Sequence, residues 1–78
     1  KEYHVTVHSP LSSEFVSQME NGLIILGKPT LPCKVTILSP IEFSIILTEG
    51  RNRQIRRMCA KLGNEVIKLK RIRIHEIL

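Results

Sequence analysis

Apolar and polar residues alternate at the start of the chain and then switch to helical spacing. The alternating residues in the predicted strand over residues 2–8 are Tyr3, Val5 and Val7. A short helix is predicted next, capped by Ser12 or Ser13 and stopped after about Asn21 by Gly22. Its apolar side consists of Leu11, Phe15, Val16 and Met19. We therefore expect a half-buried strand followed by an amphipathic helix.

The middle of the chain predicts a loop and then a β-hairpin. Prolines interrupt residues 23–32, which are expected to form a tethering loop with at most one edge strand. Alternation then resumes on both sides of a turn at Ser39 and Pro40. The alternating residues are Cys33, Val35 and Ile37 before the turn, and Phe43, Ile45 and Leu47 after it. Two antiparallel strands are the simplest structure for this pattern.

The last third predicts a second helix and a final strand. One apolar stripe at helical spacing consists of Ile55, Met58, Cys59 and Leu62. Asn52 is a suitable N-cap for this helix, and Gly63 is a suitable left-handed stop. Residues 66–77 are rich in Ile and Val and should be extended. Their alternation changes parity near Lys70 and Arg71, where we expect a bulge.

This order of elements predicts an α+β fold. Strand, helix, strand, strand, helix and strand form the split β-α-β-β-α-β (ferredoxin-like) arrangement, in which two helices cover one face of an antiparallel sheet. A chain of 78 residues can form only one small domain.

Charge and cysteine content restrict the partners and the compartment. The net charge is +5, and most of the twelve lysines and arginines lie between Arg51 and Arg73. Such a cluster favours a polyanionic partner, first nucleic acid and second an acidic membrane surface. Cys33 and Cys59 lack metal-type spacing, so we expect two reduced cysteines in the core, with a disulfide between them as the alternative. His4 and His8 have no partner ligands in the sequence, so no metal site is expected. With no membrane-spanning run and no signal peptide, we expect a cytoplasmic protein without a membrane partner.

Four arginines lie within seven residues at the start of the second helix. The basic side chains opposite the apolar stripe are Arg53, Arg56, Arg57 and Lys61. A guanidinium is always charged, binds phosphate in a forked geometry and stacks on planar groups, so this pattern suits RNA or DNA. A solvated helix with one positive side explains the same charges without any ligand.

Two longer segments carry a resemblance to a known family. Residues 49–58 read Glu-Gly-Arg-Asn-Arg-Gln-Ile-Arg-Arg-Met, and residues 69–74 read Leu-Lys-Arg-Ile-Arg-Ile. Together with the Lys-x-Tyr pattern at residues 1–3, they resemble the C-terminal part of the RsuA/RluF-type pseudouridine synthases, which isomerise uridine in ribosomal RNA. Gly27 and residues 33–35 resemble the branch that modifies large-subunit (23S-type) RNA.

The resemblance implies a role for each matching residue. Tyr3 matches the active-site tyrosine of the family. In the family a basic residue forms an ion pair with the catalytic aspartate, and Ile55 matches the apolar residue beside that pair. Arg56 is the first choice for that basic residue and Arg51 the second. Candidate RNA contacts are Arg53, Gln54, Arg57, Lys68, Lys70, Arg71 and Arg73. The family reaction implies no cofactor and no metal. The residues alone favour a simpler interpretation, in which Tyr3 is a strand residue with its hydroxyl at the rim of the core and Arg56 is a surface arginine on a helix.

All seven acidic residues of the chain are glutamates. The family nucleophile is an aspartate upstream of the Lys-x-Tyr pattern, and the family also carries a small N-terminal RNA-binding domain. We therefore expect residues 1–78 to be the C-terminal portion of a catalytic domain that is inactive alone, because both of those segments are missing. The alternatives are a non-catalytic RNA-binding module and a ribosome-associated structural protein.

Overall fold

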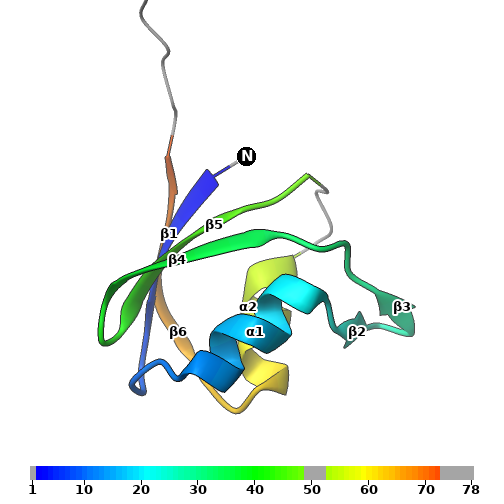
Figure 1. The fold of residues 1–78 in the computed structure, drawn as a ribbon, viewed down its shortest axis with the longest axis horizontal. Coiled ribbons are helices and arrows are strands. Elements are labelled where there is room, and N and C mark those ends of the chain that lie inside the picture. The colour runs from blue at the N-terminus through cyan, green and yellow to red at the C-terminus, as the bar shows by residue number, and fades with distance from the viewer. Residues whose placement is uncertain (1, 49–52, 73–78) are drawn as a thin grey trace, which may run out of the picture.

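The computed structural model describes residues 2–48 and 53–72. Figure 1 shows the elements in chain order. They are β1 (Glu2–Val7), α1 (Ser13–Asn21), β2 (Ile24–Ile25), β3 (Lys28–Pro29), β4 (Lys34–Ser39), β5 (Glu42–Ile46), α2 (Gln54–Lys61) and β6 (Val66–Ile72).

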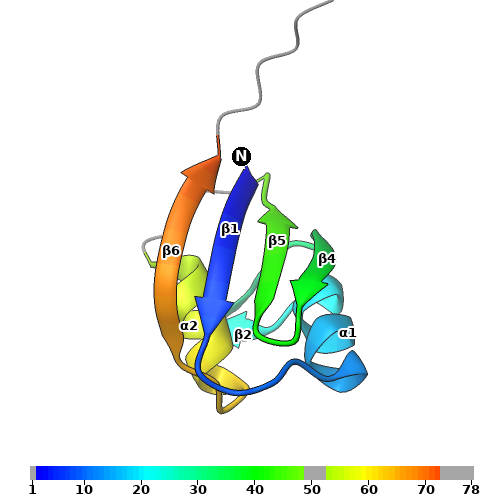
Figure 2. The same ribbon diagram turned by 90° about the vertical axis from the view of Figure 1, so that its left-hand side faces the viewer.

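Four strands form one antiparallel sheet in the order β4-β5-β1-β6. Figure 2 shows these strands side by side in front of α1 and α2, so both helices cover the same face. The predicted α+β arrangement is confirmed. We call the face opposite the helices the open face. Because β4 and β6 are the outer strands, each pairs on one side only within the described sheet.

The core lies between the sheet and the helices. Cross-strand partners share a face, and Val5 is paired with Phe43 on one side and Leu69 on the other. Val5 and Phe43 are fully buried, and Phe15 of α1 packs edge-on against Phe43 with ring centroids 5.7 Å apart. With few aromatic residues, the rest of this core is aliphatic, together with Met19, Met58 and Cys59.

Side-chain and backbone signals at both ends of α1 set its length. The backbone N–H of Phe15 donates to the Ser12 hydroxyl (3.1 Å), so Ser12 is the N-cap. Gly22 ends the helix with a φ of 99°, a value that favours glycine. Glu20 accepts a hydrogen bond from the backbone N–H of Val35 (3.0 Å), which ties the end of α1 to β4.

Residues 23–32 contain more structure than the sequence predicted. β2 and β3 pair with each other as a separate two-stranded sheet, where a loop with at most one edge strand was expected. Leu26 and Gly27 form the turn between them, and both have positive φ values. Figure 1 shows this hairpin projecting away from the main sheet, at the opposite end of the molecule from the β4–β5 turn.

A Schellman motif ends α2. The N–H groups of Gly63 and Asn64 donate to the carbonyls of Ala60 (3.0 Å) and Cys59 (2.9 Å), and Gly63 has a φ of 79°. The predicted glycine stop is therefore confirmed. At the other end the N-cap position is Arg53, where Asn52 was predicted, because Arg53 has a left-handed backbone (φ 50°) that interrupts the helical path.

The bulge in β6 lies three residues earlier than predicted. Thr6 pairs with Lys68 and Val7 with Val66, which leaves Ile67 as the extra residue. Pairing runs without a shift through Lys70 and Arg71, so the predicted bulge there is wrong. The apolar residues change parity between Leu69 and Ile72 because these two side chains lie on opposite faces of the sheet. After Ile67, β6 points Leu69 toward the core and Ile72 to the open face, opposite Glu2.

Candidate functional site

A shallow groove of about 360 Å³ runs between α2 and the start of β6. Two arginines contribute to it, from the N-cap and the first turn of the helix. Its lining residues are Arg53, Arg56, Ala60, Gly63, Asn64, Glu65 and Val66. Arg56 is half-buried and Arg53 is exposed, so the two arginines differ in their contact with water. Two arginines against one glutamate favour an anionic occupant.

The wall of this groove is held by Asn64, whose side chain is 7% exposed. The Asn64 amide donates from Nδ2 to the Ser9 carbonyl (3.1 Å) and accepts at Oδ1 from the Ser9 N–H (3.0 Å). The neighbouring Glu65 carbonyl accepts from the N–H of His8 (2.8 Å). These bonds join the loop after β1 to the loop after α2. The sequence analysis did not identify Asn64, although an asparagine directly after a helix-ending glycine was visible.

Tyr3 lies on the helix-facing side of β1. It is half-buried against the core, and its cross-strand partners are Ile45 and Arg71. Residues directly opposite in an antiparallel pair have Cβ atoms about 5 Å apart, so Arg71 is the basic side chain that register places beside Tyr3. Tyr3 is not among the residues that line the Arg56 groove.

Two predicted site residues on α2 are buried. Ile55 is 4% exposed and belongs to the core, as expected for an apolar residue at this position. Gln54 is 3% exposed, and its Nε2 donates to the Met58 sulfur (3.7 Å). This burial does not agree with the predicted contact between Gln54 and RNA at the surface. Gln54 instead packs the first turn of α2 against the core.

Comparison with known proteins shows which proteins this chain is similar to. No family model matches the chain. The dual-specificity RNA pseudouridine synthase RluF of Escherichia coli K12 is 51% identical over 77 residues, which cover 99% of this chain and 27% of the relative. Ribosomal small subunit pseudouridine synthase A of Haemophilus influenzae is 34% identical over 79 residues, 99% of this chain and 34% of that protein. The chain belongs to the RsuA/RluF family of pseudouridine synthases.

A solved structure supports both the family and the fold. A crystal structure described as pseudouridylate synthase superposes with a TM-score of 0.84 and 35% sequence identity, over 88% of this chain and 31% of that one. The chain therefore spans about a quarter to a third of the length of the relatives that it matches.

The basic residues predicted to contact RNA do not form a single surface. Arg57 lies on α2, which covers one face of the sheet, and Arg53 is the N-cap residue directly before this helix. Lys68 and Lys70 pair with Thr6 and His4, whose neighbours on β1 point into the core, so both lysines lie on the open face. An RNA that touches both groups would have to pass around the outer edge of β6. Arg51 and Arg73 lie outside the described residues.

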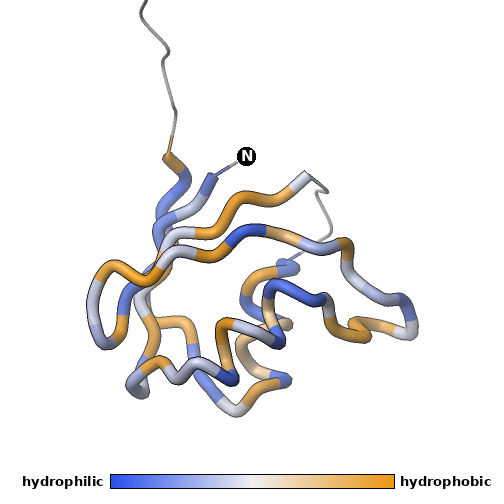
Figure 3. Tube along the Cα trace, viewed as in Figure 1, coloured by the Kyte–Doolittle hydropathy of each residue, from blue (hydrophilic) through white to orange (hydrophobic). Residues whose placement is uncertain are grey.

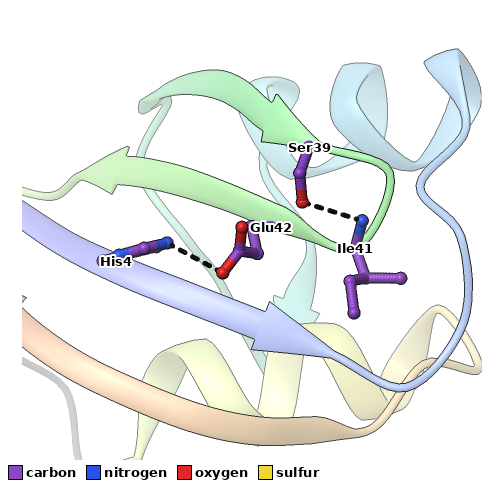
Figure 4. A network of polar contacts seen from close by, with 4 residues as sticks. All are labelled: His4, Ser39, Ile41 and Glu42. Carbon is purple, nitrogen blue, oxygen red and sulfur yellow. Dashed lines mark hydrogen bonds and ion pairs between the residues drawn. The ribbon is translucent and has the colours of Figure 1, made fainter.

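Polar side chains dominate the open face near β1. Figure 4 shows His4 reaching toward Glu42, with 3.6 Å between Nε2 and Oε2, and the backbone N–H of Ile41 donating to the Ser39 hydroxyl (3.4 Å). At this distance the His4–Glu42 contact is an ion pair only when the imidazole is protonated. Among residues 2–48 and 53–72, no group of three or more potential metal ligands comes together.

Neither Cys33 nor Cys59 is in a disulfide bond. Cys59 is fully buried, and burial raises its pKa to about 12. Cys33 is half-buried, and its thiol donates to the Met19 carbonyl (3.2 Å). The predicted place in the core is confirmed for Cys59, and Cys33 lies at the margin of the core. In the described part of the chain, no helix is long and apolar enough to cross a bilayer.

Proposed function

We propose that this chain is the C-terminal portion of the catalytic domain of an RNA pseudouridine synthase. In this proposal the complete protein isomerises uridine to pseudouridine in ribosomal RNA, with 23S-type RNA as the first candidate, in the cytoplasm. The observation that carries the proposal is the 51% identity to RluF over almost the whole chain. The arginine groove on α2 adds physical support, since a surface of this kind accepts an anionic ligand.

The family resemblance implies a role for each site residue, and the chemistry of the residue is compatible with that role. A base within folded RNA must leave its stack before an enzyme can reach it, and a flat side chain such as Tyr3 offers a face for the extruded ring. Arg56 pairs with the catalytic aspartate of the remaining protein and keeps that carboxylate ionised, because a nearby guanidinium lowers a carboxyl pKa. Arg51 is the alternative partner. Ile55 packs beside the pair and limits access of water.

Basic side chains around this centre hold the RNA backbone. The proposed contacts are Arg53, Arg57, Lys68, Lys70, Arg71 and Arg73. Arg71 is opposite Tyr3 in the sheet and is therefore a proposed contact that lies beside the proposed base pocket. The reaction draws on these side chains and the upstream aspartate, with no metal and no cofactor in the proposal.

The test is pseudouridine formation by the complete protein and its variants. Arg56→Ala should lose more than about a hundredfold in kcat with little change in RNA affinity, because the pair acts on the reacting carboxylate. Lys34→Ala, on the exposed edge strand β4, is the matched control and should keep full activity. Tyr3→Leu should lose turnover, and Tyr3→Phe should retain part of it because the ring remains.

The outcomes separate the alternatives. If Arg51→Ala abolishes turnover and Arg56→Ala does not, Arg51 is the partner of the aspartate. Full activity of both variants would exclude an arginine from this segment as that partner. A complete protein that binds ribosomal RNA but forms no pseudouridine would be the non-catalytic module. The 78-residue chain alone should show no turnover, because it contains no aspartate.

A further inference from the structure

The turn between β2 and β3 places a large apolar side chain where the backbone does not favour one. Leu26 and Gly27 have φ values of 52° and 80°, the left-handed pair of a type I′ turn. Asn, Asp and Gly are preferred at the first of these positions, and bulky side chains are disfavoured there. Leu26 is nevertheless 73% exposed, more than any other large hydrophobic residue in the described part of the chain. The fold gains little from this side chain.

The hairpin that carries Leu26 is firmly attached. Ile25 is 5% exposed and belongs to the core. At the base of the hairpin the Thr30 N–H donates to the Leu23 carbonyl (2.7 Å), and the Leu23 N–H donates to the Thr30 hydroxyl (2.8 Å). A Cβ atom added at position 22 would collide with the Thr30 carbonyl oxygen, so the chain is closely packed between Gly22 and Thr30. Leu26 is therefore presented on a rigid support.

A groove of about 450 Å³ lies between this hairpin and α2. Its apolar wall consists of Ile24, Ile25 and Leu26, and its second wall of Arg57, Ala60 and Lys61. Figure 3 shows the hydrophobic stretch along β2 at the periphery of the molecule. The lining contains two cationic side chains and no carboxylate, and Lys28 follows directly on the exposed strand β3.

Apolar and cationic walls together match the chemistry of nucleotides. An unpaired nucleotide offers a flat apolar base and an anionic phosphate, whereas in a duplex the bases are stacked and the phosphates dominate the surface. We propose that the β2–β3 turn and this groove bind unpaired loop nucleotides of an RNA, with Leu26 against a base and Arg57 and Lys61 on phosphates. This inference rests on the proposed function and adds a second contact region, formed by the hairpin together with the basic side of α2.

Leu26→Asn tests the apolar contact, because asparagine suits the left-handed turn and keeps the hairpin intact. With the 78-residue chain, affinity for a uridine-containing ribosomal RNA stem–loop should fall roughly five- to tenfold, the effect of exposing part of a leucine side chain. Affinity for the same sequence as a fully paired duplex should not change, and the thermal midpoint should be equal or higher. The matched control is Leu38→Asn, which makes the same change on a residue that is 52% exposed near the β4–β5 turn.

Lys61→Gln tests the charged wall. It should weaken stem–loop binding and lower the slope of log affinity against log salt by about one, with Lys34→Gln as the control on β4. Unchanged stem–loop affinity of Leu26→Asn would overturn the proposal and leave the proposed function intact. An equal loss on stem–loop and duplex would overturn it too, since the effect would not depend on unpaired bases. If Leu26→Asn abolishes self-association and leaves RNA affinity unchanged, the surface joins two copies of the chain and the proposal is wrong. Failure of the unmodified chain to bind either RNA would overturn the proposed contact region, whereas the proposed function is tested separately by pseudouridine formation in the complete protein.

Discussion

Asn64 joins the loop after β1 to the loop after α2, which forms one wall of the arginine groove, and its replacement by alanine should destabilise the chain. The variant loses both hydrogen bonds to the Ser9 backbone and leaves a partly buried N–H and carbonyl without those partners. Two bonds at about 1 kcal/mol each, plus incomplete rehydration of the Ser9 groups, give a loss of about 2–3 kcal/mol. For a domain of this size, the thermal midpoint should fall by about 10–20 °C.

Thermal unfolding followed by circular dichroism measures this effect, and a second variant separates the contributions of the two hydrogen bonds. Asn64→Asp retains the acceptor for the Ser9 N–H but loses the donor to the Ser9 carbonyl, so its midpoint should lie between those of Asn64→Ala and the parent. Asn21→Ala is the control, because Asn21 is exposed and makes only a 3.4 Å side-chain bond to Ser17. It should shift the free energy of unfolding by less than about 0.5 kcal/mol. An Asn64→Ala midpoint within a few degrees of the parent would refute the reasoning that this amide holds the groove wall.

Two further predictions concern backbone strain and thiol chemistry. Gly22→Ala should destabilise the chain strongly, because φ is 99° and the added Cβ would lie 2.6 Å from the Thr30 carbonyl oxygen; Gly27→Ala, with a similar φ and open space, should cost less in a urea titration. Cys59 has its pKa raised from 9.0 to about 12 by burial, so folding favours its protonated thiol. That stabilisation is complete below pH 9 and is lost as pH rises toward 12. The urea midpoint of the parent should therefore fall across this pH range, and the loss due to this thiol should be absent in Cys59→Ala. At pH 8 a thiol reagent should modify Cys33 first, and equal rates for both cysteines would contradict the burial argument.

The sequence by itself determined the order of the two helices and the four strands of the main sheet, and most of their ends. Local signals suffice where a residue acts on its own segment: Ser12 caps α1, and Gly22 and Gly63 adopt positive φ values that end the two helices. The alternation of strand residues also identified which side chains of β1 and β5 are buried. The motif at residues 49–58 identified the family, and the comparisons confirm it.

Only the tertiary structure decided where the basic side chains lie relative to one another. Side chains along a strand alternate between the two faces of a sheet, so one extra residue moves all later side chains to the opposite face. In β6 the extra residue is Ile67, and Lys68 and Lys70 therefore lie on the open face. Arg57 lies on α2, on the other side of the sheet. Pairing in the sheet also places Arg71 beside Tyr3, which no local pattern indicates.

The tertiary structure also decided that the polar side chain of Gln54 is buried. Gln54 has the polarity of a surface residue, but the left-handed backbone at Arg53 starts the helix so that the Gln54 side chain turns inward onto Met58. The β2–β3 hairpin was missed because its strands are only two residues long, too short for an alternating pattern to appear. Sequence patterns report the conformation of one segment. The relative position of two segments depends on contacts between residues far apart in the chain, and those contacts exist only in the folded protein.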